Sequence, residues 1–204
     1  MTMSKKAFGA IAVILLILLL DQIIKIWVKT HFALGEEVWI ADWFRIRFIE
    51  NPGMAMGIEV FGKLFLTIFR IVASVAIAYY IYLLIKNNFK FGYILLISMI
   101  FAGAVGNIID SIFYGVIFSE STPMHVATLF PLEGGYSGWL HGEVVDMFYF
   151  PLFHFKWPSW MPWVGGNEFE FFRYIFNFAD ASISVGIFVL LLFFRKTLSL
   201  SFEK

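Results

Sequence analysis

Four long apolar runs constrain the fold of this chain more than any other feature of its sequence. Their approximate bounds are residues 7–29, 64–85, 91–118 and 171–194. The hydrocarbon core of a bilayer is about 30 Å thick, and a helix of about 20 apolar residues crosses it. Hydrophobic residues make up 60% of the 204, more apolar surface than a water-soluble domain of this length can bury. We therefore predict an all-α membrane fold with four transmembrane helices, forming one integral membrane domain over residues 1–204.

The two longer connections, residues 30–63 and 119–170, have a different pattern. Residues 38–40 and 43–49 alternate polar and apolar side chains and are rich in β-branched and aromatic types. Such alternation predicts short strands. The first connection should therefore form a small β-rich element, and the second a long loop.

The basic residues predict the orientation. The two tails and the turn at 86–90 contain one acid, Glu203, and seven basic residues: Lys5, Lys6, Lys86, Lys90, Arg195, Lys196 and Lys204. Positively charged segments stay on the cytoplasmic side. Both termini should therefore be cytoplasmic, and the β-rich element and the long loop should be extracytoplasmic.

Polar residues within the apolar runs share one level of the bilayer. At 1.5 Å of rise per residue from the basic inner end of each helix, Asp21, Asn107 and Asp180 lie about 22, 25 and 22 Å up. Asp110 and Asn177 lie about 30 and 27 Å up. Groups from three helices thus converge in the outer third of the membrane. They could be polar pins between helices, but intramembrane acids more often mark a functional site.

Elimination narrows the chemistry. The chain has no cysteine, its four histidines are scattered in outer segments, and it has no His-Glu-x-x-His motif. Ser182 and Ser184 have no base at their level. Two carboxylates that share a proton and one water remain, one as general base and the other as general acid. Asp146, in an apolar stretch of the long loop, could contribute, since burial would raise its pKa, although it could also be an ordinary loop carboxylate.

Five sequence blocks then resemble those of lipoprotein signal peptidase, the type II bacterial signal peptidase. They are Asp21-Gln22-Ile23-Ile24-Lys25, Glu50-Asn51-Pro52-Gly53-Met54-Ala55-Met56-Gly57, Gly106-Asn107-Ile108-Ile109-Asp110, Gly142-Glu143-Val144-Val145-Asp146 and Phe176-Asn177-Phe178-Ala179-Asp180. The resemblance implies that Asp146 and Asp180 are catalytic. It implies substrate-binding or supporting roles for Asp21, Lys25, Asn51, Gly53, Asn107, Asp110 and Asn177.

The resemblance also implies a substrate and a location. The family removes signal peptides from prolipoproteins by cleaving before the diacylglyceryl-modified cysteine. We therefore expect a monomeric aspartic endopeptidase of the bacterial cytoplasmic membrane, in contact with membrane lipid, with its active site near the outer face. We expect no metal, cofactor or nucleic acid. A carrier of protons or ions through Asp21, Asp110 and Asp180 is the alternative, and a non-catalytic assembly factor is another.

The sequence departs from the family pattern at one residue and in the length of one segment. Ser111 stands where the family usually has arginine, and about thirty residues separate it from Gly142, more than expected. The insertion, residues of about 112–141, should be an extra outer lid or surface element. We expect the substitution Ser111→Arg to be tolerated, because a long side chain at the outer end of a helix can reach the interface.

Overall fold

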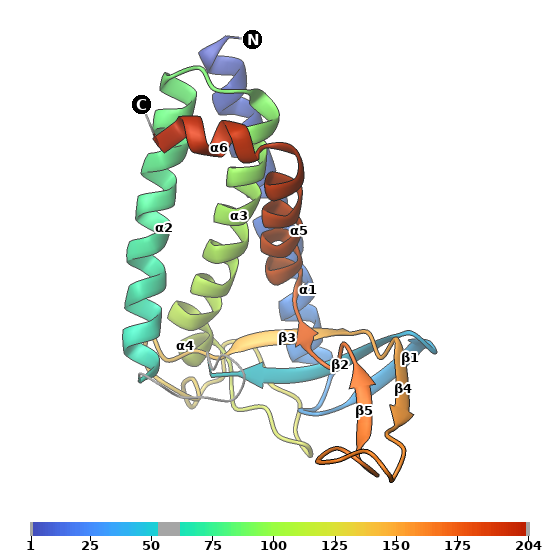
Figure 1. The fold of residues 1–204 in the computed structure, drawn as a ribbon. Coiled ribbons are helices and arrows are strands. Elements are labelled where there is room, and N and C mark those ends of the chain that lie inside the picture. Colours follow the sequence, from blue (N-terminus) through green and yellow to red (C-terminus); the bar gives the residue numbers. More distant parts are fainter. Residues whose placement is uncertain (1, 53–61, 203–204) are drawn as a thin grey trace.

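The computed structural model describes residues 2–52 and 62–202, and Phe202 only in its backbone. Its long helices stand side by side, the strands lie at one end of them, and both termini lie at the other end (Figure 1). The long helices are α1 (Met3–His31), α2 (Lys63–Lys86) and α3 (Phe91–Ile109). A π-helical turn (Asp110–Tyr114) and α4 (Gly115–Ile117) continue α3. The first three helices therefore agree with the predicted runs.

The fourth predicted helix, 171–194, begins later than expected. Helix α5 covers Phe178–Phe193, and α6 (Arg195–Phe202) follows at 92°. In the described part of the chain, three helical stretches are long and apolar enough to cross a membrane, and a fourth span results only if α5 and α6 count as one.

The side chain of Asn177 sets the start of α5. Its Oδ1 accepts a hydrogen bond from the Asp180 N–H at 2.9 Å, and Asp180 Oδ2 accepts from the Asn177 N–H at 3.4 Å. This reciprocal capping satisfies backbone donors that have no partner inside the helix. The apolar residues before it belong to strands instead: Phe171 ends β5 (Glu168–Phe171), and Ile175 and Phe176 form β6, where the Phe176 ring stacks on Phe150 with centroids 5.7 Å apart.

The strands form two antiparallel sheets. The larger sheet has the order β1-β2-β3-β6, with β1 at Glu37–Ala41, β2 at Phe44–Asn51, β3 at Val144–Tyr149 and β6 at Ile175–Phe176. Strands β4 (Phe153–Lys156) and β5 (Glu168–Phe171) form a separate hairpin. The strands predicted at 38–40 and 43–49 are confirmed as β1 and β2. The pairing of β2 with β3 places Ile49 opposite Asp146 and connects the two long connections.

Small residues allow α3 to approach its neighbours closely. Helix α3 packs against α1, α2 and α5. A Cβ atom on Gly103 would lie 2.4 Å from the carbonyl oxygen of Ala179, and one on Gly106 would lie 2.7 Å from Asp21 Oδ2. Only glycine permits this spacing, which brings the polar side chains of α1, α3 and α5 within hydrogen-bonding range of each other.

Candidate active site

A buried ion cluster joins α1 to the end of α3. Lys25 Nζ lies 2.9 Å from Asp21 Oδ2 and 2.8 Å from Asp110 Oδ2, and all three side chains are fully buried. The spacing of four residues places Asp21 and Lys25 on one face of α1. Two carboxylates and one ammonium are costly to bury unless they are paired and hydrogen-bonded, and each of these groups has both kinds of partner.

Further hydrogen bonds fix the orientation of these acids. Gln22 Nε2 donates to Asp110 Oδ1 at 2.9 Å, and the Tyr114 hydroxyl donates to Gln22 Oε1 at 3.1 Å. Asp21 Oδ1 accepts from the backbone N–H of Ala179 at 2.8 Å, in the first turn of α5. Asp21 therefore holds the start of α5 against α1, where the helix dipole also favours a carboxylate.

Two asparagine amides link this cluster to Asp180 and Asp146. Asn107 Oδ1 accepts from Lys25 Nζ at 2.8 Å, and its Nδ2 donates to Asp180 Oδ1 at 2.8 Å. Asn177 Nδ2 donates to Asn107 Oδ1 at 3.1 Å and to Asp146 Oδ1 at 2.6 Å. The lysine ammonium is an obligate donor, so it sets the orientation of the Asn107 amide. The two amides thus lie between the two carboxyl groups and hold them in one polar site.

Asp146 reaches the site from the sheet. It lies on β3, 2% exposed, and its Oδ2 also accepts a hydrogen bond from Asn51 Nδ2 at 3.3 Å. Burial, with a smaller contribution from the negative charge of Asp180, raises the pKa of Asp146 from 3.8 to about 7. The hydrogen bonds from Asn51 and Asn177 and the charge of Lys25 act in the opposite direction. Asp146 therefore retains its proton at much higher pH than an exposed aspartate.

The predicted convergence of polar residues is confirmed by these contacts. One network joins eight of the nine predicted site residues: Asp21, Lys25, Asn51, Asn107, Asp110, Asp146, Asn177 and Asp180. The ninth, Gly53, lies outside the described residues. Sequence reasoning missed Gln22 and Tyr114 as members. Gln22 lies beside Asp21 within the first block, and that position in an apolar helix was a usable signal.

A second buried ion pair lies next to the site. The ammonium of Lys29 contacts the Glu50 carboxylate and Ser121 Oγ, which in turn donates to Glu50 Oε1 at 3.0 Å. Lys29 follows Lys25 by four residues and so lies on the same face of α1, and this spacing in the sequence was a usable signal for its role. Glu50 precedes Asn51 on β2. The Lys29–Glu50 pair therefore holds in place the strand whose Asn51 donates a hydrogen bond to Asp146.

Three residues of the insertion contact this ion pair. The ring centroids of Phe118 and Tyr136 lie 5.3 and 5.0 Å from Lys29 Nζ. Phe118, Ser121 and Tyr136 all belong to the insertion, and Phe118 and Tyr136 pack into the hydrophobic cluster beside the end of α1. Cation–π contacts of this kind are strongest where water is excluded.

The reasoning behind the Ser111→Arg expectation is wrong in this structure. Ser111 is 2% exposed, and its hydroxyl donates to the Asn107 carbonyl oxygen at 3.0 Å. Its own carbonyl oxygen accepts from the Gly142 N–H at 2.9 Å. The Ser111 side chain is therefore buried and does not face the interface, and the chain that follows the insertion contacts its backbone.

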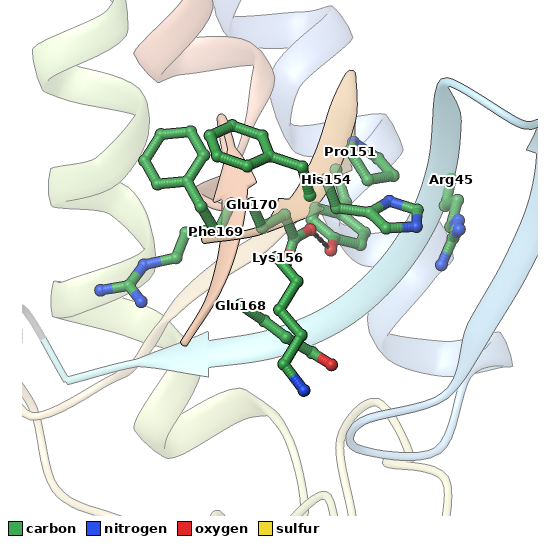
Figure 2. Close-up of a pocket in the computed structure, with 10 residues that line it drawn as sticks. Arg45, Pro151, His154, Lys156, Glu168, Phe169 and Glu170 are labelled. Atoms are coloured by element: carbon green, nitrogen blue, oxygen red, sulfur yellow. Dashed lines mark hydrogen bonds between the residues drawn. The ribbon is translucent and has the colours of Figure 1, made fainter. Parts of the chain in front are cut away.

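A cavity of about 560 Å³ lies away from this network. It occupies the side of the β4–β5 hairpin and is lined by side chains of both charges, including Arg45, Lys156, Glu168 and Glu170 (Figure 2). The Tyr149 hydroxyl donates to the Glu170 carboxylate there. Neither Asp146 nor Asp180 lines this cavity, so its size does not make it the reaction site.

Comparisons with known proteins agree on one family. The family model described as "Signal peptidase (SPase) II" matches residues 13–196. A lipoprotein signal peptidase of Porphyromonas gingivalis is 54% identical over 193 residues, which are 93% of this chain and 84% of the relative. One of Amoebophilus asiaticus is 34% identical over 209 residues, 99% of this chain and 84% of the relative.

Solved structures share the fold. Two, each described as a bacterial membrane enzyme, are 24% identical to this chain with TM-scores of 0.60 and 0.63. The first alignment covers 92% of both chains, and the second covers 96% of this chain and 92% of the other. By the family model and the extent of identity with its relatives, the chain belongs to the signal peptidase II family.

Proposed function

We propose that this protein is a membrane-embedded aspartic endopeptidase that removes the signal peptide from prolipoproteins, cleaving before the diacylglyceryl-modified cysteine. Membership of the signal peptidase II family and the names of the relatives support the reaction class. The observation that carries the mechanism is the pair of amides, Asn107 and Asn177, which holds the carboxyl groups of Asp180 and Asp146 in one buried site.

The two aspartates divide the roles of acid and base. Asp146, whose pKa is raised to about 7, supplies the proton, and the Asp180 carboxylate accepts one from the attacking water. The water oxygen then bonds to the carbonyl carbon of the scissile peptide. Collapse of the tetrahedral intermediate breaks the C–N bond, and the leaving amine takes the Asp146 proton. Asn51 and Asn177 keep the Asp146 carboxyl in place through the cycle.

The ion cluster of Lys25, Asp21 and Asp110 supports the two aspartates of the proposed active site. Lys25 forms ion pairs with both Asp21 and Asp110 and fixes the amide of Asn107, which then holds Asp180. This pairing also weakens the alternative of a proton or ion carrier. Two of the three acids that such a carrier would use already share a buried lysine.

The membrane placement belongs to the same proposal. The α5–α6 pair completes a fourth span, both termini are cytoplasmic, and the sheet and the active site lie at the outer face. The termini at one end of the bundle and the basic residues near it support this topology (Figure 1). The enzyme acts as a monomer in contact with membrane lipid. Reporter fusions at Asn88 and Ser137 test the topology, which requires an inside signal from the first and an outside signal from the second.

Substitution of each aspartate tests the mechanism. An amide is nearly isosteric with a carboxyl group but cannot transfer the proton, so Asp146→Asn and Asp180→Asn should each abolish cleavage of a lipid-modified precursor. The double variant should be little worse than either single one, because residues that act as a unit are strongly non-additive. Purified variants are compared by cleavage rate and melting temperature. A folded Asp146→Asn enzyme with near-normal turnover would remove Asp146 from the mechanism.

A further inference from the structure

A second cavity reaches the proposed active site from within the helix bundle. It has a volume of about 250 Å³ and lies between α2, α3 and α5. Asp180 and Asn107 line one side of it, Arg70 and Ser74 of α2 contribute the other polar groups, and the rest of the lining is apolar. The proposed mechanism uses Asp180 and Asn107 but gives no role to the two residues of α2.

Arg70 carries a charge at an unusual place. It follows Lys63, the first residue of α2, by seven positions, which is about 10 Å along the helix. No hydrogen bond or ion pair joins its guanidinium to another residue in the part of the chain that the structure describes. Cationic side chains inside an apolar span are costly and generally face a cavity that serves function.

Ser74 is a second, independent sign of a ligand. Its side chain is 6% exposed, and Ser74 Oγ has no hydrogen-bond partner among the described residues. Buried hydroxyl groups are normally hydrogen-bonded, because an unpaired one loses its water without compensation. Other buried serines of the bundle follow this rule: Ser98 Oγ donates to the Ile94 carbonyl at 2.8 Å.

The spacing of these two donors matches an extended peptide. Residues four apart lie on one face of a helix and about 6 Å apart along its axis. In an extended chain, carbonyl groups that point to the same side recur every second residue, about 6.6 Å apart. A peptide lying along α2 could thus place one carbonyl on Arg70 and the next same-side carbonyl on Ser74.

We propose that Arg70 and Ser74 bind two alternate main-chain carbonyl groups of the signal peptide, just before the bond that is cut. This assignment rests on the proposed function. A peptide must leave the helical conformation for its scissile bond to reach the aspartates, and in lipid the released carbonyls need donors. Arg70 holds the carbonyl nearer the scissile bond, and Ser74, deeper along α2, holds the one two residues farther away.

The test is a backbone scan of the substrate. Lipid-modified precursor peptides carry a single thioamide at successive positions before the cut, since sulfur accepts hydrogen bonds less well than oxygen. For the wild-type enzyme, KM should rise about threefold or more at two positions two residues apart and little between them. Arg70→Met should erase the effect at the nearer position, and Ser74→Ala at the farther one.

The variants should also bind the unmodified precursor more weakly. We expect KM to rise about three- to tenfold for Ser74→Ala and about ten- to hundredfold for Arg70→Met, with a smaller change in kcat. Arg70→Leu, which also removes the donor, replaces Arg70→Met if the latter does not fold. The matched controls are Ser98→Ala, a buried serine outside the cavity, and Arg195→Met, at the far end of the bundle; both should keep the wild-type thioamide pattern.

The outcomes separate this inference from the proposed function. If wild-type protein does not cleave the precursor, the proposed function fails. If it cleaves, but the thioamide pattern is flat or is the same in Arg70→Met and Ser74→Ala as in wild type, the assignment of the two residues is overturned and the peptidase function stands. A uniform rise of KM across all peptides would also overturn it, since that indicates a general effect on folding or on lipid contact.

Discussion

Asn177 Nδ2 donates a hydrogen bond to Asp146 Oδ1 at 2.6 Å, and the same side chain caps α5 through its Oδ1. One asparagine therefore both starts the helix that carries Asp180 and orients the aspartate that comes from the sheet. This dual use explains why a polar residue occurs within the last apolar run and why the helix begins there.

The two uses of Asn177 can be separated by substitution. Serine caps helices about as well as asparagine but has no amide to donate to Asp146 from the same position. We expect Asn177→Ser to keep the melting temperature close to wild type and to lower kcat at least tenfold. Asn177→Ala should lower kcat similarly and also cost about 1 kcal/mol of stability from the lost cap. An Asn177→Ser enzyme with wild-type kcat would show that the bond to Asp146 is dispensable.

The rate of cleavage should fall with rising pH. Asp146 acts as the acid and its pKa is raised to about 7, so its proton, and with it activity, is lost as the pH passes 7. The Asn51 amide favours the ionised form of Asp146, and so do Asn177 and Lys25, whereas the charge of Asp180 opposes it. Asn51→Ala should therefore move the alkaline limb of the kcat/KM profile to higher pH. Movement to lower pH would contradict the assignment.

The buried pairing of Lys25 should dominate stability at the site. Lys25→Met leaves Asp21 and Asp110 buried without their counter-charge, and breaking a buried pair costs about 3–5 kcal/mol. Adding Asp110→Asn should recover part of the loss, since one uncompensated charge is removed. Lys90→Met, at an exposed lysine, is the control. Urea or thermal unfolding in detergent measures the stability of each variant. Equal stability of Lys25→Met and Lys90→Met would show that the buried pairing of Lys25 does not stabilise the protein.

Ser111→Arg should now destabilise the protein. The side chain is buried and bonded to the Asn107 carbonyl oxygen, so a larger group must displace its neighbours, at a cost of about 1–3 kcal/mol or more. Ser111→Ala, which loses one hydrogen bond, should cost about 1 kcal/mol at most. Melting curves and cleavage rates decide; a stable, active Ser111→Arg enzyme would mean that the insertion moves aside easily.

The Lys29–Glu50 pair should behave as one unit. Lys29→Met and Glu50→Gln should each reduce stability by several kcal/mol, about 3 or more, because each leaves a buried polar partner. The double variant should cost clearly less than the sum of the two. Because Glu50 adjoins Asn51, kcat should fall along with stability in both single variants. Additive effects in this double-mutant cycle would show that the two side chains are not coupled.

The sequence by itself determined the first three apolar helices, the strands of the first connection and the similar heights of the polar groups along their helices. Those features are local: a run of apolar residues predicts a helix, and a fixed rise per residue places Asp21, Asn107 and Asp180 at similar heights. The ordered blocks also predicted which residues belong together. Packing was not needed for any of this.

The tertiary structure decided which side chains meet. The rotation of each helix about its axis depends on contacts between distant segments, such as Gly103 against Ala179, and the sequence pattern does not specify it. The predicted start of the last helix was wrong because Ile175 and Phe176 pair with the remote strand β3 and so belong to the sheet. The partners of Lys29 lie in the insertion, and the lack of a partner for Ser74 is visible only once its neighbours are in place. Pairing and burial are properties of the packed bundle, since each requires surfaces from several elements at once.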